Sequence, residues 1–298
     1  MLKFKILIDN RPADNPCCPL KSEHGLSIFI EHNVSRILCD TGASAAFMEN
    51  AADMGIKLAE TDLCIISHGH SDHTGGLYAF LASTAIPESN QQKPTNVYLS
   101  GQIEEERYFS NRRGLMRDIS TDHKIFEKYR NRLATIGESQ WLTPDIAAVK
   151  CTCNKFPQPN GNKFLGTACR TQQAPLEGIT NDPFTHELAL AIKTPKGIAI
   201  FSPCSHNGLF NIIDSCLNFT RDSRLLAFIG GLHLVDGCET GEEILEMART
   251  FAKKYPDARL FTGHCTGDMA IEIFKSSLPD GKFGVFNTGF ECTLTNTL

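Results

Sequence analysis

The chain has 298 residues, of which 41% are hydrophobic and 21% are charged, and its formal net charge is −5 at pH 7. This composition is typical of a soluble globular protein, and no apolar run approaches the roughly 18 to 20 residues that a membrane span needs. Nucleic-acid binding relies on clustered lysine and arginine, which this acidic chain lacks over any long stretch. We therefore expect no nucleic-acid or membrane partner. The first residues lack the layout of a secretion signal, which predicts a cytoplasmic protein.

The N-terminal residues predict a meander of three strands followed by a helix. Residues 1–9 alternate between polar and apolar side chains, and further apolar runs follow at 28–30 and 36–39. Such short runs, separated by turn residues, are typical of paired strands. The small residues after Asp40 then let the backbone turn into a helix at about 44–54. Asp40 is either a carboxylate that orients a metal-binding histidine or a cap of this turn.

The strongest chemical signal lies in residues 67–73, which read Ser-His-Gly-His-Ser-Asp-His directly after an apolar run that predicts a buried strand. Neutral imidazole and carboxylate are the usual ligands of zinc, iron and manganese. The spacing differs from the helical His-Glu-x-x-His pattern of metalloproteases. A turn between a strand and a helix can direct alternate side chains toward one spot. We expect one metal ion at His68 and His70 and a second at Asp72 and His73.

The middle of the chain is less regular. A helix is expected from Thr74 to just before Pro87, a strand at 96–99, and helical pieces at 103–109 and 124–133. Between 152 and 183, prolines and glycines interrupt any long element. Long irregular stretches inside compact domains are usually lids or binding loops, so we assign about 87–182 to substrate recognition. Arg112, Arg113 and Arg117 form a local basic patch in this region that could receive a phosphate.

Regular elements return in the last third. A hairpin is expected from 187–193 and 198–201, then a helix at 209–219, a strand at 225–229, a helix that begins with a capping box at Thr240, and a strand at 259–262. Histidines follow three of these strands, at His206, His233 and His264. Loops at the carboxyl ends of strands gather at one edge of a layered α/β fold. We therefore expect these histidines to converge on the 67–73 cluster.

These motifs resemble the metallo-β-lactamase superfamily. Residues 68–73 match its His-x-His-x-Asp-His signature, and residues 40–42 and 263–264 stand where the superfamily carries its aspartate turn and its final ligand. Residues 23–27, 204–206, 230–233 and 263–267 are similar to the branch named for the dihydropterin ribofuranosylaminobenzene-phosphate synthase of the methanopterin pathway. The resemblance implies a four-layer αββα sandwich, with residues 1–298 as one domain and an irregular insertion at about 87–182.

The resemblance also implies the ligands of two divalent metal ions, with zinc expected first and iron or manganese as alternatives. His68, His70 and His206 would hold the first ion, and the second would be held by Asp72, His73 and His264. The superfamily commonly has a bridging aspartate after the strand that here ends in Ser-Pro-Cys-Ser at 202–205, and no carboxylate occupies that position. The bridge is then Cys204 or hydroxide alone, or the second site is weak.

The function implied first is hydrolysis of a small ester, lactone or phosphoester by a metal-bound hydroxide, with Asp72 both ligating and orienting the nucleophile. Glu23, His24 and His233 are the candidates for substrate contact, although Glu23 is almost equally well explained as a turn-stabilising residue. One alternative is a transferase that condenses a pterin diphosphate with an aminobenzene ribofuranosyl phosphate. Another is an iron protein with a redox or sensing role. In each case the expected partner is a small molecule.

Overall fold

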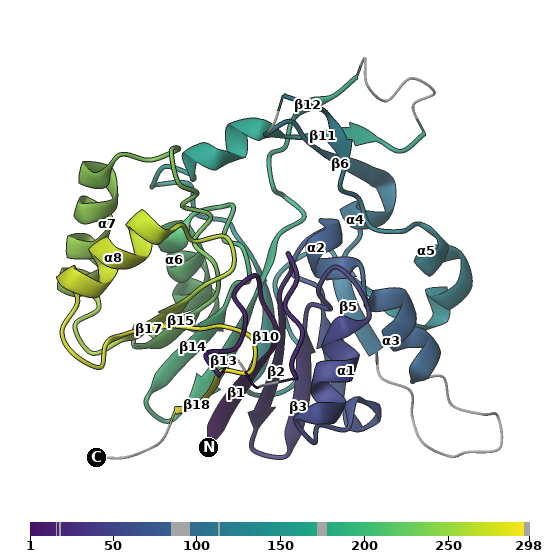
Figure 1. The fold of residues 1–298 in the computed structure, drawn as a ribbon, viewed down its shortest axis with the longest axis horizontal. Coiled ribbons are helices and arrows are strands. Elements are labelled where there is room, and N and C mark those ends of the chain that lie inside the picture. Colours follow the sequence, from purple (N-terminus) through teal and green to yellow (C-terminus); the bar gives the residue numbers. More distant parts are fainter. Residues whose placement is uncertain (16, 18, 85–95, 113, 172–177, 295–298) are drawn as a thin grey trace.

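A computed structural model describes residues 1–15, 17, 19–84, 96–112, 114–171 and 178–294. Within these residues the strands form two seven-stranded sheets and one four-stranded sheet. The two large sheets lie face to face, helices cover both outer faces, and the small sheet lies across one end (Figure 1). The expected four-layer αββα sandwich is confirmed.

The first large sheet contains the predicted meander. Its order is β18-β1-β2-β3-β4-β5-β8, antiparallel from β18 to β3 and parallel from β3 to β8. Phe4 and Ile6 of β1 face the core between the sheets. Leu7 of β1 and Phe29 of β2 face the outer helices. The strands are β1 Leu2–Ile8, β2 Ser27–His32, β3 Ser35–Cys39, β4 Leu63–Ile65, β5 Asn96–Ser100, β8 Leu133–Ile136 and β18 Glu291–Leu294.

The second large sheet repeats this arrangement. Its order is β17-β16-β15-β14-β13-β10-β9, antiparallel from β9 to β14 and parallel from β14 to β17. The predicted hairpin is β13 and β14. Because both faces of the sheet are covered, its strands are apolar on both sides, as the uniformly buried β14 shows. The strands are β9 Gln140–Trp141, β10 Ile146–Lys150, β13 Leu188–Thr194, β14 Gly197–Phe201, β15 Leu225–Ile229, β16 Arg259–Thr262 and β17 Phe283–Val285.

The helices form the two outer layers. One apolar cluster packs α1, α3 and α5 on the first sheet, and another packs α6, α7 and α8 on the second. The capping box expected at Thr240 is present, because the Thr240 side chain and Glu243 bond each other's backbone N–H groups. No helix in the described residues is both long and apolar enough to cross a membrane. The helices are α1 Ala46–Asp53, α2 Ser71–Thr74, α3 Leu77–Ser83, α4 Gln102–Glu105, α5 Lys124–Tyr129, α6 Leu209–Thr220, α7 Gly241–Lys254 and α8 Asp268–Ser277, with 3₁₀ turns η1 Leu58–Glu60, η2 Arg130–Arg132 and η3 Asn160–Phe164.

The helix expected from Thr74 onward is divided into α2 and α3. Gly75 and Gly76 lie at the break, where an added Cβ would come within 2.1 Å of the Ala43 carbonyl oxygen and 2.3 Å of the Thr41 carbonyl oxygen, respectively. These glycines let the chain after the histidine motif pass close to the loop that follows β3. The end expected for the helix, just before Pro87, lies outside the described residues.

The segment at 87–182 is more regular than the sequence predicts. The helix expected at 103–109 ends at Glu105, and the following residues form β6, because buried Tyr108 and Phe109 pair with β11. A five-residue strand is too short for its periodicity to distinguish it from a helix. The segment also supplies β5, β8 and β10 to the large sheets. The small sheet, of order β12-β11-β6-β7, consists of β6 Glu106–Ser110, β7 Arg117–Asp118, β11 Leu165–Cys169 and β12 Thr180–Asn181.

Candidate metal centre

The predicted site residues lie in loops at the carboxyl ends of strands from both large sheets. Four of these loops contain a residue that is not glycine in the left-handed region of backbone conformation. They are Asp40 (φ 61°) after β3, Ser205 (61°) after β14, His233 (50°) after β15 and His264 (50°) after β16. Such residues cost free energy that the surrounding contacts must offset, and they cluster at functional sites.

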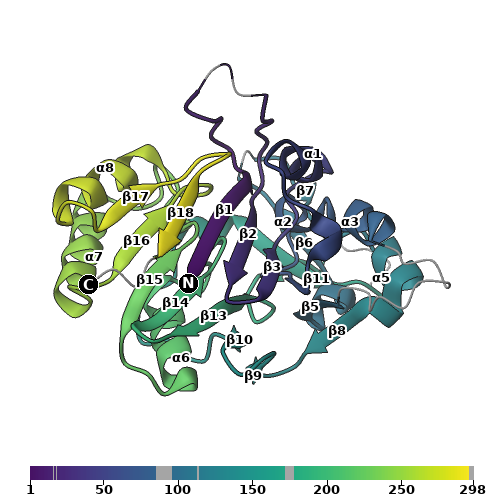
Figure 2. The same cartoon turned by 90° about the horizontal axis from the view of Figure 1, so that it is seen from below.

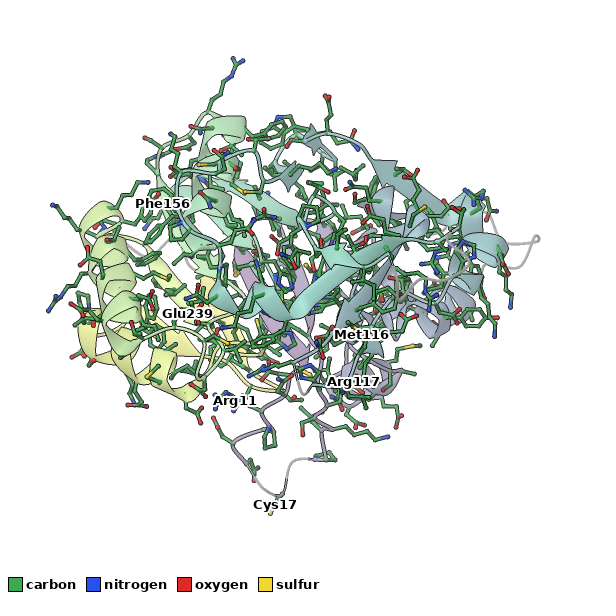
Figure 3. The ribbon with its side chains drawn as sticks, turned by 90° about the horizontal axis from the view of Figure 1, so that it is seen from above. Arg11, Cys17, Met116, Arg117, Phe156 and Glu239 are labelled. Atoms are coloured by element: carbon green, nitrogen blue, oxygen red, sulfur yellow. The ribbon has the colours of Figure 1, made fainter. Side chains whose placement is uncertain are left out.

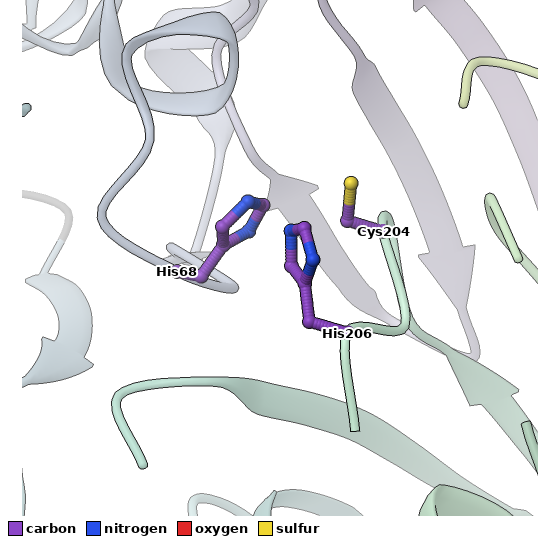
Figure 4. Close-up of side chains that lie close together, drawn as sticks. All are labelled: His68, Cys204 and His206. Atoms are coloured by element: carbon purple, nitrogen blue, oxygen red, sulfur yellow. The ribbon is translucent and has the colours of Figure 1, made fainter. Parts of the chain in front are cut away.

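His68, His70 and His206 come together as one group. His68 Nε2 lies 3.1 Å from His70 Nδ1. The His206 ring, supplied by the other sheet, has its centroid 4.9 Å from that of His68 and 5.0 Å from that of His70. Figure 4 shows the His68 and His206 rings directed toward each other from two separate loops. Sequence positions far apart in the chain thus share one space.

The second predicted group also converges. His73 Nε2 lies 3.1 Å from His264 Nε2, and Asp72 Oδ2 lies 3.6 Å from each of these two nitrogens. Two nitrogens that share a tetrahedral zinc ion, with bonds of about 2.0–2.1 Å, are separated by roughly 3.3 Å. The spacing of the ring nitrogens in both groups is close to this value.

Asp40 and Ser67 fix the orientation of two of the histidines. Asp40 Oδ2 lies 2.6 Å from His73 Nδ1 and also accepts a hydrogen bond of 2.6 Å from the Ser67 hydroxyl. The Ser67 oxygen in turn lies 2.8 Å from His68 Nδ1. Because that hydroxyl donates to Asp40, His68 Nδ1–H must donate to Ser67. In both rings Nδ1 is thus the nitrogen that contacts the protein, which leaves Nε2 as the atom for a metal ion.

Two asparagines that the sequence did not identify hold the remaining histidines. Asn162 Oδ1 lies 3.1 Å from His206 Nδ1, and its amide nitrogen donates to the His206 carbonyl oxygen at 2.8 Å. Likewise, Asn10 Oδ1 lies 3.1 Å from His264 Nδ1, and the Asn10 amide nitrogen donates to the His264 carbonyl oxygen at 3.2 Å. Asn10 lies two residues after the end of β1, so its position near a strand end was a usable signal, whereas nothing in the sequence around Asn162 distinguishes it.

Two buried acidic residues stabilise the loops that carry the candidate ligands, on the side away from the cavity. Glu187 accepts hydrogen bonds from the backbone N–H groups of His206 (2.7 Å) and Asn207 (2.8 Å). Asp182 Oδ2 lies 3.0 Å from His186 Nε2, and His186 Nδ1 accepts from the Gly69 N–H at 3.1 Å. His186 follows no predicted strand, and the sequence alone predicts only a packing or surface role for it. The structure places it directly beneath the loop that carries His68 and His70.

Cys204 lies between the two histidine groups. Its thiol belongs to one set of ligand atoms with His68 and His206 and to another with His73 and His264, and within each set all atoms lie within 4.8 Å of one another. Figure 4 shows the Cys204 side chain pointing into the same space as the His68 and His206 rings. No other side chain of the described residues appears in both sets. In the 202–205 loop, where the superfamily commonly has a bridging aspartate, this chain thus has a thiol that can reach both groups.

The protonation states of the histidines suit metal binding. Burial among other imidazoles lowers the pKa of His68 and of His206 well below the ordinary value, and burial lowers the pKa of His70 to about 3 and that of His264 to about 4. These rings are neutral at pH 7. His206 Nε2 is buried without a hydrogen-bond partner among the described residues. A buried nitrogen lone pair without a donor is costly, and a cation would satisfy it.

The second group of candidate ligands differs from the first, because carboxylates surround it. Burial opposes protonation of His73, but the charges of Asp72 and Asp40 outweigh it and raise the pKa of His73 to about 9. Burial would raise the pKa of Asp72, yet the neighbouring His73 and His264 imidazoles hold it below its ordinary value. A positive charge is therefore stabilised here, and a metal cation can take the place of the proton. The residues fit the metal ions that the motif implies.

The three candidates for substrate contact are placed differently. His24 is exposed at the cavity, with Nε2 3.5 Å from Asp72 Oδ2, and half-buried His233 lines the same cavity. Glu23 does not line the cavity. One of its carboxylate oxygens accepts from the backbone N–H groups of Ala43 and Ser44, both at 3.0 Å, and the other accepts from the Ser44 hydroxyl. The turn-stabilising role is therefore the one we assign to Glu23.

A cavity of about 790 Å³ opens onto these groups. Its wall combines candidate metal ligands with the small sheet, including Asp72, His206, His264, Arg112 and Arg117. The chain after β7 is fastened to the histidine loop, because Ser71 N–H donates to the Ile119 carbonyl oxygen at 2.7 Å. Figure 3 views this end of the molecule and labels Arg117, where β7 begins. The small sheet thus forms one wall of the opening.

The architecture is that of the metallo-β-lactamase fold. A metal-dependent hydrolase of the β-lactamase superfamily, Tm1679, superposes with a TM-score of 0.75 at 22% identity and covers 98% of this chain and 99% of its own. A diphosphatase from the PhnP family superposes with a TM-score of 0.53 at 15% identity, over 98% of both chains. The expected resemblance to this superfamily is confirmed.

Sequence comparison gives more particular relatives. The 7,8-dihydropterin-6-methyl-4-(β-D-ribofuranosyl)-aminobenzene-5′-phosphate synthase of Methanocaldococcus jannaschii is 28% identical over 274 residues, which is 86% of this chain and 85% of the synthase. This similarity agrees with the branch indicated by the motifs. The family model of the anti-Pycsar protein Apyc1 matches residues 21–153.

Proposed function

We propose that this protein is a metal-dependent hydrolase of a small phosphoester. Among the ester, lactone and phosphoester classes, the observation that favours a phosphoester is a pair of arginines on the cavity wall, called here the cationic wall, which lies in a lining that also includes Asp118 and Asp236. Arg112 and Arg117 line the same space as Asp72 and His264, and their side chains make no hydrogen bond or ion pair within the described residues. Guanidinium groups match the geometry and the charge of phosphate oxygens, whereas a neutral ester or a lactone offers them no charge.

The proposed metal ligands are His68, His70 and His206 for one cation and Asp72, His73 and His264 for the other, with Cys204 between them. When bound, such cations lower the pKa of water and polarise a phosphoryl oxygen. The chain itself supplies orientation. Asp40, Asn10 and Asn162 fix the imidazoles, so that little reorganisation is needed when substrate binds. Asp72 Oδ2, an acceptor at the cavity wall, orients the attacking water, and the exposed imidazole of His24 contacts the substrate.

The test compares substrate classes under the same conditions. The protein, supplied in turn with zinc, manganese or iron, is assayed with bis(4-nitrophenyl) phosphate, 4-nitrophenyl phosphate, 4-nitrophenyl acetate and γ-butyrolactone. We expect metal-dependent turnover of a phosphoester and little turnover of the neutral substrates. Faster hydrolysis of the acetate or of the lactone, with no phosphoester turnover under any of the three metals, would contradict the proposal.

A double variant tests the cationic wall itself. Arg112→Gln with Arg117→Gln is expected to lower kcat/KM for the phosphoester by about tenfold or more, because a hydrogen bond to a charged group contributes about 1.5–3 kcal/mol. Metal content should not change. The matched control is Arg249→Gln on the exposed face of α7, which does not line the cavity. An equal loss in the control variant, or no loss in the double variant, would count against this assignment.

The second candidate function is a transferase. It is favoured by the similarity to the Methanocaldococcus jannaschii synthase over most of both chains. In this reaction the same cavity would hold a pterin diphosphate, and an aromatic acceptor would take the place of water. Release of pyrophosphate only when the diphosphate and the acceptor are both present would support the transferase. Release from the diphosphate alone would support the hydrolase.

A further inference from the structure

Two thiols meet beside the metal centre. Cys204 follows β14 and Cys265 follows β16, and their sulfur atoms lie 3.4 Å apart. Both residues are free thiols and both line the cavity. They are 61 positions apart in the chain, so the contact is a product of the fold. The proposed metal sites use only one of the two, because Cys265 is absent from every ligand set that contains His68 or His73.

The backbone around Cys265 leaves room for this contact. Gly231, in the loop after β15, lies between the two cysteine-bearing loops, and an added Cβ at this position would come within 2.4 Å of Cys265 Sγ. The Cys265 sulfur also accepts a hydrogen bond from the His233 N–H at 3.3 Å. Three neighbouring strand ends therefore hold Cys265 against Cys204.

Cys204 consequently has several alternative uses, one of which is a further set of possible ligand atoms shared with His233 and Cys265. Its sulfur can complete the sets of ligand atoms with His68 and His206 or with His73 and His264, or it can bond to the sulfur of Cys265. A thiolate bound to a metal ion is shielded from oxidation, whereas a disulfide sulfur is a poor ligand, since the thiolate is the form that binds metal.

We propose that Cys204 and Cys265 form a reversible disulfide, and that its formation competes with metal binding at Cys204. The pair is thus an oxidation site for a peroxide that enters the cavity. The consequence for hydrolysis rests on the proposed function, whereas the disulfide and its competition with metal do not.

The chemistry balances with hydrogen peroxide as the oxidant. Cys265 is half-buried while Cys204 is only 4% exposed, so the peroxide reaches Cys265 first. The Cys265 sulfur attacks one peroxide oxygen, the O–O bond breaks, and a sulfenic acid and one water form. The Cys204 sulfur then attacks the sulfenic sulfur, its S–H proton leaves with the hydroxyl as a second water, and the S–S bond forms. The sulfur atoms must approach from 3.4 Å to about 2.05 Å. A dithiol reductant returns two electrons and two protons and restores both thiols.

The test maps the disulfide directly. The full chain, prepared metal-free and with saturating zinc, is treated with a small excess of hydrogen peroxide, alkylated, and digested without reductant. Mass spectrometry should find the Cys204 peptide linked to the Cys265 peptide, with two hydrogens lost. Saturating zinc should slow formation of this linked peptide by roughly tenfold, a typical size for coupling between two binding events. Incubation with a dithiol should remove the link and restore the zinc-binding stoichiometry.

Two variants complete the experiment. Cys265→Ser should abolish the link and should retain its zinc after a peroxide treatment that removes zinc from the unmodified protein. Cys169→Ser removes an exposed thiol that does not line the cavity, and it should behave as the unmodified protein does. If Cys265→Ser fails to fold, the peptide map of the unmodified protein still decides the question.

The outcomes separate the two proposals. Absence of the linked peptide in metal-free protein whose Cys169 has been oxidised would overturn the inference, and so would a link that forms equally fast with and without zinc. A linked peptide that competes with zinc, in a protein that hydrolyses no phosphoester, would support the disulfide and refute only the proposed function.

Discussion

The two large sheets contribute to the proposed metal centre in different ways. The first sheet supplies its candidate ligands from one short loop, residues 68–73, between β4 and the end of α2. The second supplies Cys204, His206 and His264 from separate strand ends that include residues with left-handed backbone. One half of the site is therefore formed within a single loop, while the other half forms only when the loops after β14 and β16 are folded next to each other. Asp40 orders the local loop through Ser67 and His73, whereas Asn10, which lies after β1 of the first sheet, holds His264 of the second sheet and so links the halves.

The largest effect is expected from removing a ligand of the local loop. His70→Ala should eliminate metal-dependent turnover, with a loss of at least about 100-fold, because even the partners that only orient metal ligands contribute about 10–100-fold. Metal content, measured by elemental analysis, should fall together with activity. Full activity in this variant would show that the loop does not hold the metal.

A smaller effect is expected at the residue that serves two histidines of the loop. Asp40→Asn keeps the shape of the side chain but removes the charge that faces His73 Nδ1 at 2.6 Å and replaces one of the two oxygens that accept from Ser67 by an NH2 donor. Metal affinity should fall by about 10–100-fold, as measured by competition with a chromophoric chelator. A change in folding stability with unchanged metal affinity would indicate that Asp40 only caps the turn.

A still smaller effect is expected on the half supplied by the second sheet. Asn162→Ala removes the group that fixes the His206 ring from one side, and about a tenfold loss of metal affinity should follow. Asn10→Ala provides the matched variant for His264. If the halves hold separate ions, titration should show one weakened site in each single variant, whereas equal weakening of both sites in each would show that the halves act together.

The smallest effect is expected far from the centre. Thr240→Ala removes the capping box of α7 and should destabilise the fold by about 1 kcal/mol, measured by urea denaturation. Metal affinity should be unchanged, since α7 contributes no residue to the proposed metal sites or to the cavity wall. Loss of metal in this variant would show that the second-sheet half of the site depends on global stability.

The difference between the halves also explains what the sequence could predict. The 67–73 motif and the strand ends at His206 and His264 were recognisable, because the chemistry lies beside a local pattern. The roles of Asn162, Glu187 and Cys265 were not, because each depends on a contact made across the fold by a residue type that is common in loops. The strand at 106–110 was missed for a similar reason, since its partner β11 lies in a stretch interrupted by glycine and proline.

The pairing of β1 with β18 has a consequence for the newly made chain. Figure 2 shows β1 between β2 and β18, and the register joins Phe4 to Cys292. Until residues 291–294 have left the ribosome, one side of β1 presents unpaired backbone groups, which are a template for association with other chains. Contacts of such long sequence separation also form slowly. During synthesis, protection of this exposed edge, for example by a chaperone, should therefore matter more for yield than any single residue of the cavity.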